Sequence, residues 1–337
     1  MYFLKKILFV MFISLFSVSA TFAQDGIYDD LRDPVMDRLK GKKVVFVPMG
    51  MNFELTLAWA AEMKREADAK GYTVDIKDPN WDPSVGNRAI TQAILDKPDL
   101  IVTQNFDVST YTRALNKAMK AGIKVIQVNQ RASIKTDGFV GADWHSIGET
   151  LAARMLELCG KDKGKSGKVS LVQGQATAAA SVYQLNPIMT MFKDNPNIEV
   201  VSSQPADWDA SKARAITQTV IAQNPDLCGV IGFWDGQDSG AAAAIKESGK
   251  DIALVTSGGG SVGQACDMIK NGTYDSLASY QNVLQGHDIN SLISILLQSD
   301  AKAGEQKIML YTPTKLITKE NINTDSCWDI ENLYKYN

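Results

Sequence analysis

The chain has 337 residues, with 35 basic and 38 acidic side chains, two histidines and four cysteines. This mildly acidic, mixed charge argues against a nucleic acid or an anionic membrane surface as the partner. The histidines, His145 and His287, are too few for a zinc site in a chain that has no CxxC motif. We therefore expect neither a metal nor another cofactor.

The N-terminus has the charged, apolar and small-residue order of a secretory signal peptide. MYFLKK precedes the 14-residue run ILFVMFISLFSVSA, and TFA follows before Gln24. We predict cleavage after Ala23 and localisation in the periplasm. A membrane anchor is the alternative, but the run is shorter than the roughly 18 apolar residues of a spanning helix. Removing residues 1–23 leaves 314 of the 337 residues, enough for two domains.

The four cysteines are those of an exported chain, in which disulfides persist. If Cys159 closes a helix and Cys228 opens a strand, both lie at the same end of a parallel sheet. This placement favours pairing Cys159 with Cys228, and Cys266 with Cys327. Buried free thiols remain the alternative.

Short β-rich apolar runs alternate with helical patterns along the whole chain. The first series of runs is KKVVFVPM, YTVDIKD, LIVTQ and KVIQVN, and the second is KVSLVQG, IEVVSSQP, CGVIGF, IALVTS and SLASYQ. Such alternation is typical of βα units around a parallel sheet. The sequence thus predicts an α/β fold with two Rossmann-like, doubly wound lobes.

The two halves also repeat in letters. RAITQ begins at Arg88 and again at Arg214, an offset of 126 residues (214 − 88). In this register 105–107 (NFD) matches 233–235 (FWD), and both triplets follow a strand and precede a helix. Ligands of open α/β sheets collect at this edge, beside helix N-termini. Two such edges facing each other form a cleft.

Aromatic rings beside amide and carboxylate groups suit a polyhydroxylated ligand, because a ring packs on the apolar face of a sugar while polar groups bond its hydroxyls. The expected ligand-binding residues are Phe53, Glu54, Gln104, Asn105, Phe106, Asn129, Arg131, Gln184, Trp208, Trp234, Asp235, Tyr280 and Gln281. Further candidates are Asp107, Gln130, Asp143, Trp144, Asn186 and Phe233. As alternatives, a single aromatic residue only covers the sheet edge, and Asp107 or Asp235 only caps a helix.

The glycine-rich stretch 257–263 (SGGGSVG) fits two catalytic patterns. As GxGxxG it lacks the acidic residue after the next strand that a dinucleotide ribose requires. As GxSxG it needs His287 as base, inside an expected helix at 284–297. We therefore expect no enzyme, and interpret the stretch as a loop that lets backbone approach a ligand or hinge.

The segments KAMKAGIKVIQVNQRAS, SSQPADWD, IGFWD and IALVTSGGG resemble the type I periplasmic solute-binding proteins of ABC importers, the class typified by ribose-binding protein. The resemblance covers nearly the whole mature chain and implies two lobes joined by three crossing segments, near 132–141, 282–286 and 312–316. The N-terminal lobe is then 24–133 plus 282–313, and the C-terminal lobe is 134–281 plus 314–337. All four cysteines fall in the second lobe.

The resemblance places an aromatic ligand residue at Trp208 and a polar one at Gln104 or Asn105. Asn129-Gln130 replaces an Asp-Arg pair, with Arg131 one place later. Trp234 replaces an amide before Asp235, Gly258 replaces an Asp, and Tyr280 or Gln281 takes the place of a late Gln. Losing charged groups and gaining aromatic ones argues against ribose, and for another neutral sugar, a polyol or a furanosyl signal molecule.

The expected function is capture without chemistry. The ligand stabilises a closed form that an inner-membrane ABC permease recognises. The alternative is the ligand-binding subunit of a periplasmic sensor or chemotaxis system, and a secreted enzyme is the third reading. We expect a monomer.

Overall fold

The computed structural model describes residues 29–329. The expected signal peptide, residues 1–23, lies outside them. The chain forms two compact units, residues 1–38 and 39–337. Helix α1 (Arg32–Leu39) falls almost wholly in the first, and everything below concerns the second. Within residues 29–329 no helix has the length and apolar character needed to cross a membrane.

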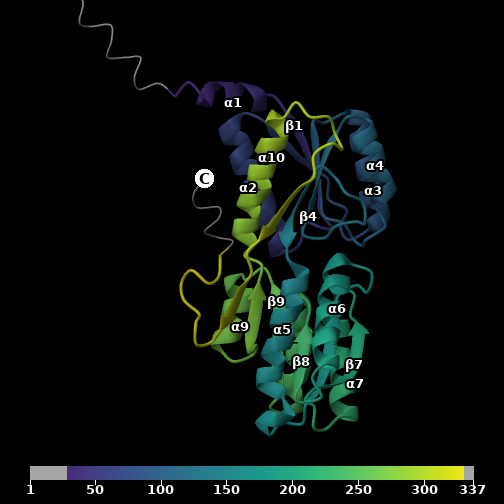
Figure 1. Cartoon of the computed structure of the whole chain (residues 1–337), viewed down its shortest axis with the longest axis vertical. Helices are drawn as coiled ribbons and strands as arrows, with labels where there is room; N and C mark the ends of the chain where they lie inside the picture. Colours follow the sequence, from purple (N-terminus) through teal and green to yellow (C-terminus); the bar gives the residue numbers. More distant parts are fainter. Residues whose placement is uncertain (1–28, 330–337) are drawn as a thin grey trace, which may run out of the picture. The chain divides into compact units, whose positions relative to one another are not determined.

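The first sheet has six parallel strands in the order β11-β5-β4-β3-β1-β2. The strands are β1 (Lys43–Val47), β2 (Thr73–Ile76), β3 (Leu100–Thr103), β4 (Lys124–Val128), β5 (Gly138–Ala142) and β11 (Ile308–Thr312). The helices are α2 (Glu54–Lys70), α3 (Pro83–Asp96), α4 (Thr112–Lys120) and α10 (Asn282–Gln298). α2 packs beside α10, and α3 beside α4 (Figure 1).

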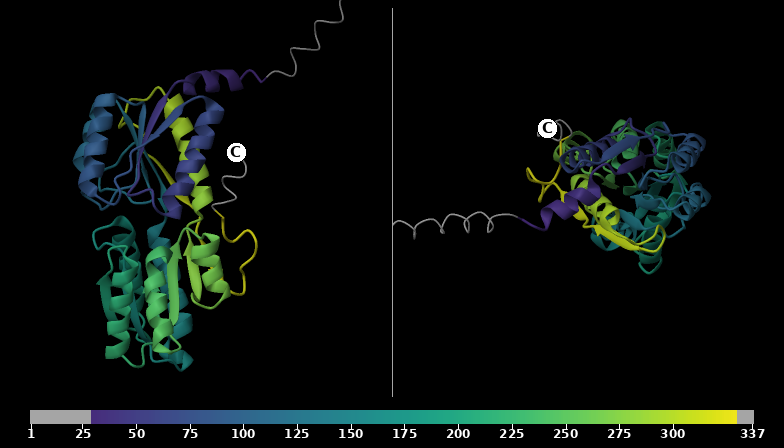
Figure 2. Two further views of the ribbon diagram at one scale, coloured as in Figure 1. Left: turned by 180° about the vertical axis from the view of Figure 1, so that it is seen from behind. Right: turned by 90° about the horizontal axis from the view of Figure 1, so that it is seen from above.

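The second sheet also has six strands, in the order β12-β10-β9-β8-β6-β7, with β12 antiparallel at one edge. The strands are β6 (Lys168–Gln173), β7 (Glu199–Pro205), β8 (Gly229–Gly232), β9 (Ala253–Gly258), β10 (Ser276–Ser279) and β12 (Lys315–Thr318). The helices are α5 (Trp144–Cys159), the 3₁₀ turn η1 (Lys161–Lys163), α6 (Ala179–Lys193), α7 (Ala210–Gln223), α8 (Asp235–Ser248), the π turn η2 (Val262–Cys266) and α9 (Asp267–Lys270). Figure 2 shows this lobe from behind. The prediction of two doubly wound α/β lobes is confirmed.

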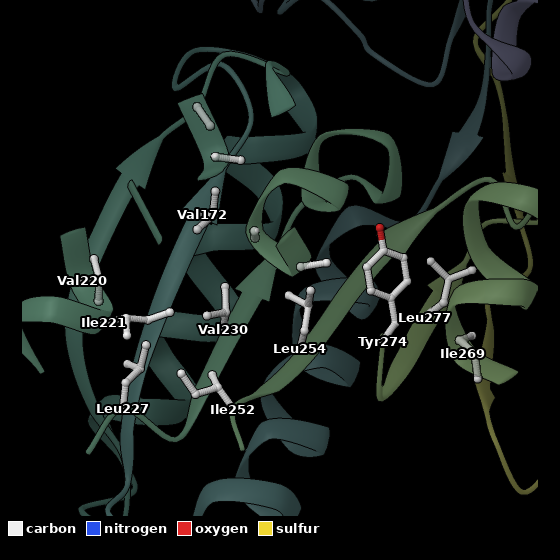
Figure 3. Close-up of a cluster of buried hydrophobic side chains, with 14 of the residues drawn as sticks. Val172, Val220, Ile221, Leu227, Val230, Ile252, Leu254, Ile269, Tyr274 and Leu277 are labelled. Carbon is white, nitrogen blue, oxygen red and sulfur yellow. The ribbon is translucent and has the colours of Figure 1, made fainter. Parts of the chain in front are cut away.

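Both sheets are buried on their two faces, as parallel sheets covered by helices must be. Every residue of β3 and β8 is buried. In the second lobe the core runs from Val172 past Val230 and Leu254 to Leu277 (Figure 3). Burial of each such side chain contributes about 1.5–3 kcal/mol. Tyr274 lies in this core, and its hydroxyl donates to the backbone oxygen of Asp235 at 2.8 Å.

The first crossing between the lobes lies later than predicted. Strand β5 pairs with β4 and β11 in the first sheet, so assigning Gly138–Ala142 to the second lobe was wrong. All five residues are buried there, and a Cβ on Gly138 would lie 2.5 Å from Leu292 of α10. The chain leaves the first sheet only at Asp143. It returns between β10 and α10, and crosses again between β11 and β12.

The disulfide pairing predicted from the sequence is confirmed. Cys159 bonds Cys228 with a Cα–Cα distance of 5.7 Å, and Cys266 bonds Cys327 at 6.1 Å. The first bridge joins the end of α5 to the start of β8. The second ties the chain after β12 to the turn that precedes α9.

Candidate functional site

A cavity of about 30 Å³ lies between residues of the two lobes. Its lining comes mainly from loops after strands and from helix starts, where α/β sheets place their ligands. The first lobe contributes Met49, Phe53, Leu55, Trp81, Gln104, Asn129 and Gln130, and the second contributes Trp144, Ala180, Trp208, Phe233, Trp234 and Tyr280. None of these side chains is charged. The volume holds only one or two water molecules.

Three tryptophans and a phenylalanine form an aromatic cluster in this lining. The ring of Trp234 lies between Trp81, at 6.4 Å between centroids, and Trp208, at 6.3 Å. Phe53 contacts Trp81 at 5.0 Å and Trp234 at 5.7 Å. Tilted and edge-on contacts at these distances are favourable for aromatic pairs. The cluster joins the two lobes.

Trp81 and Trp208 hold equivalent places in the internal repeat. They are 127 positions apart (208 − 81), one more than the offset of the RAITQ segments. Both follow the second strand of their lobe and have a φ of 64°. Asp82 and Asp209, the residues that follow them, cap α3 and α7 by accepting backbone N–H groups.

The backbone around both tryptophans is strained. Asn80 and Asp207, which precede them, also have positive φ, at 48° and 55°. A bulky residue in the left-handed region is an outlier, and each such residue costs about 1–3 kcal/mol. Because the same strained pair occurs in both lobes, the fold maintains it at a cost, as it does at ligand-binding sites.

Each tryptophan ring lies over a glycine that follows the first strand of its lobe. A Cβ on Gly50 would lie 2.8 Å from the indole nitrogen of Trp81, and one on Gly174 would lie 2.0 Å from the ring of Trp208. Any side chain at these positions would push the ring away. The glycines therefore fix how deep each ring can lie.

Three carboxamides supply the polar part of the lining. Gln104 accepts from the N–H of Met49 at 3.2 Å, and Gln130 accepts from the N–H of Ala180, in the other lobe, at 2.9 Å. Asn129 accepts from Gln285 at 3.3 Å. The three amide nitrogens donate to no residue within 29–329. The site therefore offers N–H donors to a ligand that carries hydrogen-bond acceptors.

Asp235 lies beside the lining and is buried, with 2 % exposed. It is the first residue of α8, and its carboxylate accepts backbone N–H groups of Gly236, Gly259 and Gly260. Burial raises the pKa of this carboxyl to about 7, opposed by those hydrogen bonds and reinforced by the charge of Glu54. A Cβ on Gly258 would lie 2.0 Å from the carboxylate. Asp235 thus fills the volume of the aspartate that the resemblance led us to expect at 258.

Six of the expected ligand residues line the cavity: Phe53, Gln104, Asn129, Trp208, Trp234 and Tyr280. The others lie outside its lining. Glu54 has one carboxylate oxygen that is buried and makes no hydrogen bond. Asn105 donates to Gln127 and to the backbone of Gln130, and Phe106 lies in the first-lobe core against Tyr111.

The remaining expected residues serve contacts within the protein. Gln184 accepts from the hydroxyl of Ser257 at 3.0 Å. The guanidinium of Arg131 lies 4.9 Å from the ring centroid of Tyr183. Gln281 donates to the backbone oxygen of Pro313 at 2.7 Å. Among the further candidates, Gln130, Trp144 and Phe233 line the cavity.

Sequence reasoning missed Trp81, Met49, Leu55 and Ala180 as lining residues. Trp81 had a signal in the sequence, since continuing the repeat backwards from Arg88 and Arg214 aligns it with Trp208. Met49, Leu55 and Ala180 carry no chemistry that distinguishes them from core residues.

The catalytic patterns do not come together. The hydroxyl of Ser261 accepts from the N–H of Gln264 at 3.2 Å, at the start of η2. His287 lies on α10 of the first lobe, with Nδ1 3.9 Å from Glu62 Oε2. Within residues 29–329 no three His, Cys, Asp or Glu side chains form a group that could hold a metal ion.

Two doubly wound lobes with a cavity between their loop edges define a two-lobed binding protein. The chain belongs to the family described as periplasmic binding protein domain, whose profile matches residues 44–301.

Individual relatives resemble the chain at lower identity. It is 26% identical to the D-allose-binding periplasmic protein of Escherichia coli (strain K12) over 46% of this chain, which spans about half, 52%, of that protein. It is 25% identical to the D-ribose/D-allose-binding protein of Pseudomonas aeruginosa (strain PAO1), covering 82% of this chain and 88% of that one. The crystal structure of a galactofuranose binding protein superposes with a TM-score of 0.72 at 19% identity, covering 87% of this chain and 97% of the other.

Proposed function

We propose that this protein captures a neutral sugar, polyol or similar small polyhydroxylated ligand between its lobes and carries out no chemistry on it. The observation that carries the proposal is the lining itself, with aromatic rings and carboxamides from both lobes and no charged side chain. Rings cover the apolar faces of a sugar, and the free amide N–H groups donate to its hydroxyl oxygens. The absence of a guanidinium or ammonium in the lining disfavours anionic ligands.

Contacts from both lobes give the ligand higher affinity for the closed form than for an open one. This differential affinity is what drives lobe closure on binding. We propose that the closed form delivers the ligand to an inner-membrane ABC permease, and that the chain reaches the periplasm through a signal peptide cleaved after Ala23. The names of the allose- and ribose-binding relatives support this role.

A thermal-shift screen tests the proposal. The mature chain, residues 24–337, is refolded to remove any carried-over ligand and mixed with pentoses, hexoses, cyclitols and linear polyols. A ligand at 100 times its Kd adds about 2.7 kcal/mol to the free energy of unfolding, a rise in Tm of about 2–4 °C. One strong response among neutral compounds supports capture. Silence across the panel, with responses to organic anions or peptides, would contradict it.

A further inference from the structure

The space between Trp81 and Trp208 is occupied by the side chain of Trp234. Pockets for small ligands have volumes of about 300–1,000 Å³, whereas this cavity measures about 30 Å³. A monosaccharide cannot enter unless part of the lining moves. The contacts of the three tryptophans indicate which part that is.

Trp81 and Trp208 are held in place. The indole of Trp81 donates to Asn52 at 2.6 Å, and its backbone N–H donates to Met49 at 2.8 Å. The backbone N–H of Trp208 donates to Gln237 at 2.9 Å, and its ring packs against the first-lobe core. Moving either ring would break these contacts.

Trp234 has no such anchor. Its indole N–H donates to no residue within 29–329, and its ring contacts are with Phe53, Trp81 and Trp208. It caps α8 with an extended backbone and makes no side-chain capping bond. The next residue, Gly236 after Asp235, leaves room beside the indole, where a Cβ would lie 2.6 Å from it. The side chain can rotate without losing a hydrogen bond.

We infer that Trp234 is a plug, whose indole occupies the ligand position between Trp81 and Trp208 and is displaced when the ligand binds. The ligand is then cyclic, with two apolar faces that replace the two faces of the indole. This inference rests on the proposed function and deepens it, since it selects ring-form sugars and cyclitols over linear polyols.

The plug predicts a kinetic effect that a merely structural tryptophan would not produce. Only the fraction of molecules with the indole displaced can bind, which lowers the apparent association rate. Replacing Trp234→Ala should raise the association rate constant at least about tenfold, measured by stopped-flow mixing with the sugar that responds in the screen. Trp328→Phe removes an indole outside the cavity lining and should leave the rate unchanged.

Free indole provides a second readout. Trp234→Ala should bind indole in the vacated space, whereas the wild type should not, because a ring-sized apolar cavity accepts a matching ring. Indole and sugar should then exclude each other in competition titrations.

Simultaneous binding of indole and sugar to Trp234→Ala, or an unchanged association rate, would overturn the plug. A different outcome separates it from the proposed function. If the variant binds indole but neither variant nor wild type binds any sugar, the space has the inferred shape and the proposal of sugar capture is wrong.

Discussion

Gly174 and Trp208 share one volume, because a Cβ on Gly174 would lie 2.0 Å from the indole ring. Gly174→Ala should therefore push the ring into the cavity and raise the Kd for ligand at least about tenfold, equivalent to 1.4 kcal/mol. Isothermal titration of the purified variant measures this. Gly263→Ala is the matched control, since no atom lies within 4 Å of a Cβ there. Equal affinities for the two variants would show that the position of the ring does not matter.

Trp81 and Trp208 should contribute to binding from opposite lobes. Trp81→Ala and Trp208→Ala are each expected to raise the Kd at least about tenfold, because each removes one aromatic wall of the site. Asn52→Ala, which removes only the acceptor of the Trp81 indole, should have a smaller effect. If only the Trp208 variant lost affinity, the equivalence of the two lobes would be structural rather than functional.

Two buried carboxyls should make stability depend on pH. Burial raises the pKa of Asp235 and of Asp238 from 3.8 to about 7. Between pH 4 and 7 the folded state retains protons that the unfolded chain has lost, so the free energy of unfolding falls as pH rises. The slope is at most about 1.4 kcal/mol per pH unit for each group.

Asp238→Asn should reduce that slope, measured by urea unfolding at pH 4, 5, 6 and 7. The exposed Asp251→Asn serves as control and should leave the slope as in the wild type. An identical slope in Asp238→Asn would mean that this carboxyl does not retain its proton in the fold.

Both disulfides should stabilise the second lobe. They close loops with sequence separations of 69 and 61 residues, each worth about 4 kcal/mol in the chain-entropy account. A reducing agent should lower the Tm of the mature chain, and the double variants Cys159→Ala/Cys228→Ala and Cys266→Ala/Cys327→Ala should each reproduce part of the loss. A Tm that is the same with and without reductant would contradict this.

The periodicity of the sequence predicted the two lobes because buried parallel strands and amphipathic helices leave regular apolar patterns. The β5 boundary was missed for a physical reason. β5 ends at Ala142 and α5 begins at Trp144, so the strand of one lobe runs almost directly into the helix of the other. No turn residues mark the change of lobe.

The site was harder to predict because neighbouring residues in an extended segment point in opposite directions. Gln104 lines the cavity, while Asn105 bonds Gln127 inside the first lobe. Gln130 lines it, while Arg131 stacks on Tyr183. Sequence identifies which loop carries the site, but a shift of one position decides which side chain reaches it.

The three lobe crossings are short and linked to one another. One residue separates β5 from α5, and two separate both β10 from α10 and β11 from β12. The rings of Trp144 and Tyr280 join the first crossing to the second at 5.4 Å, and Gln281 bonds Pro313 of the third. Three short, linked straps suppress sliding and twisting between the lobes and leave a single bending mode. The protein therefore works as a one-axis mechanism, in which a ligand contact at any point of the cavity is converted into the same rotation.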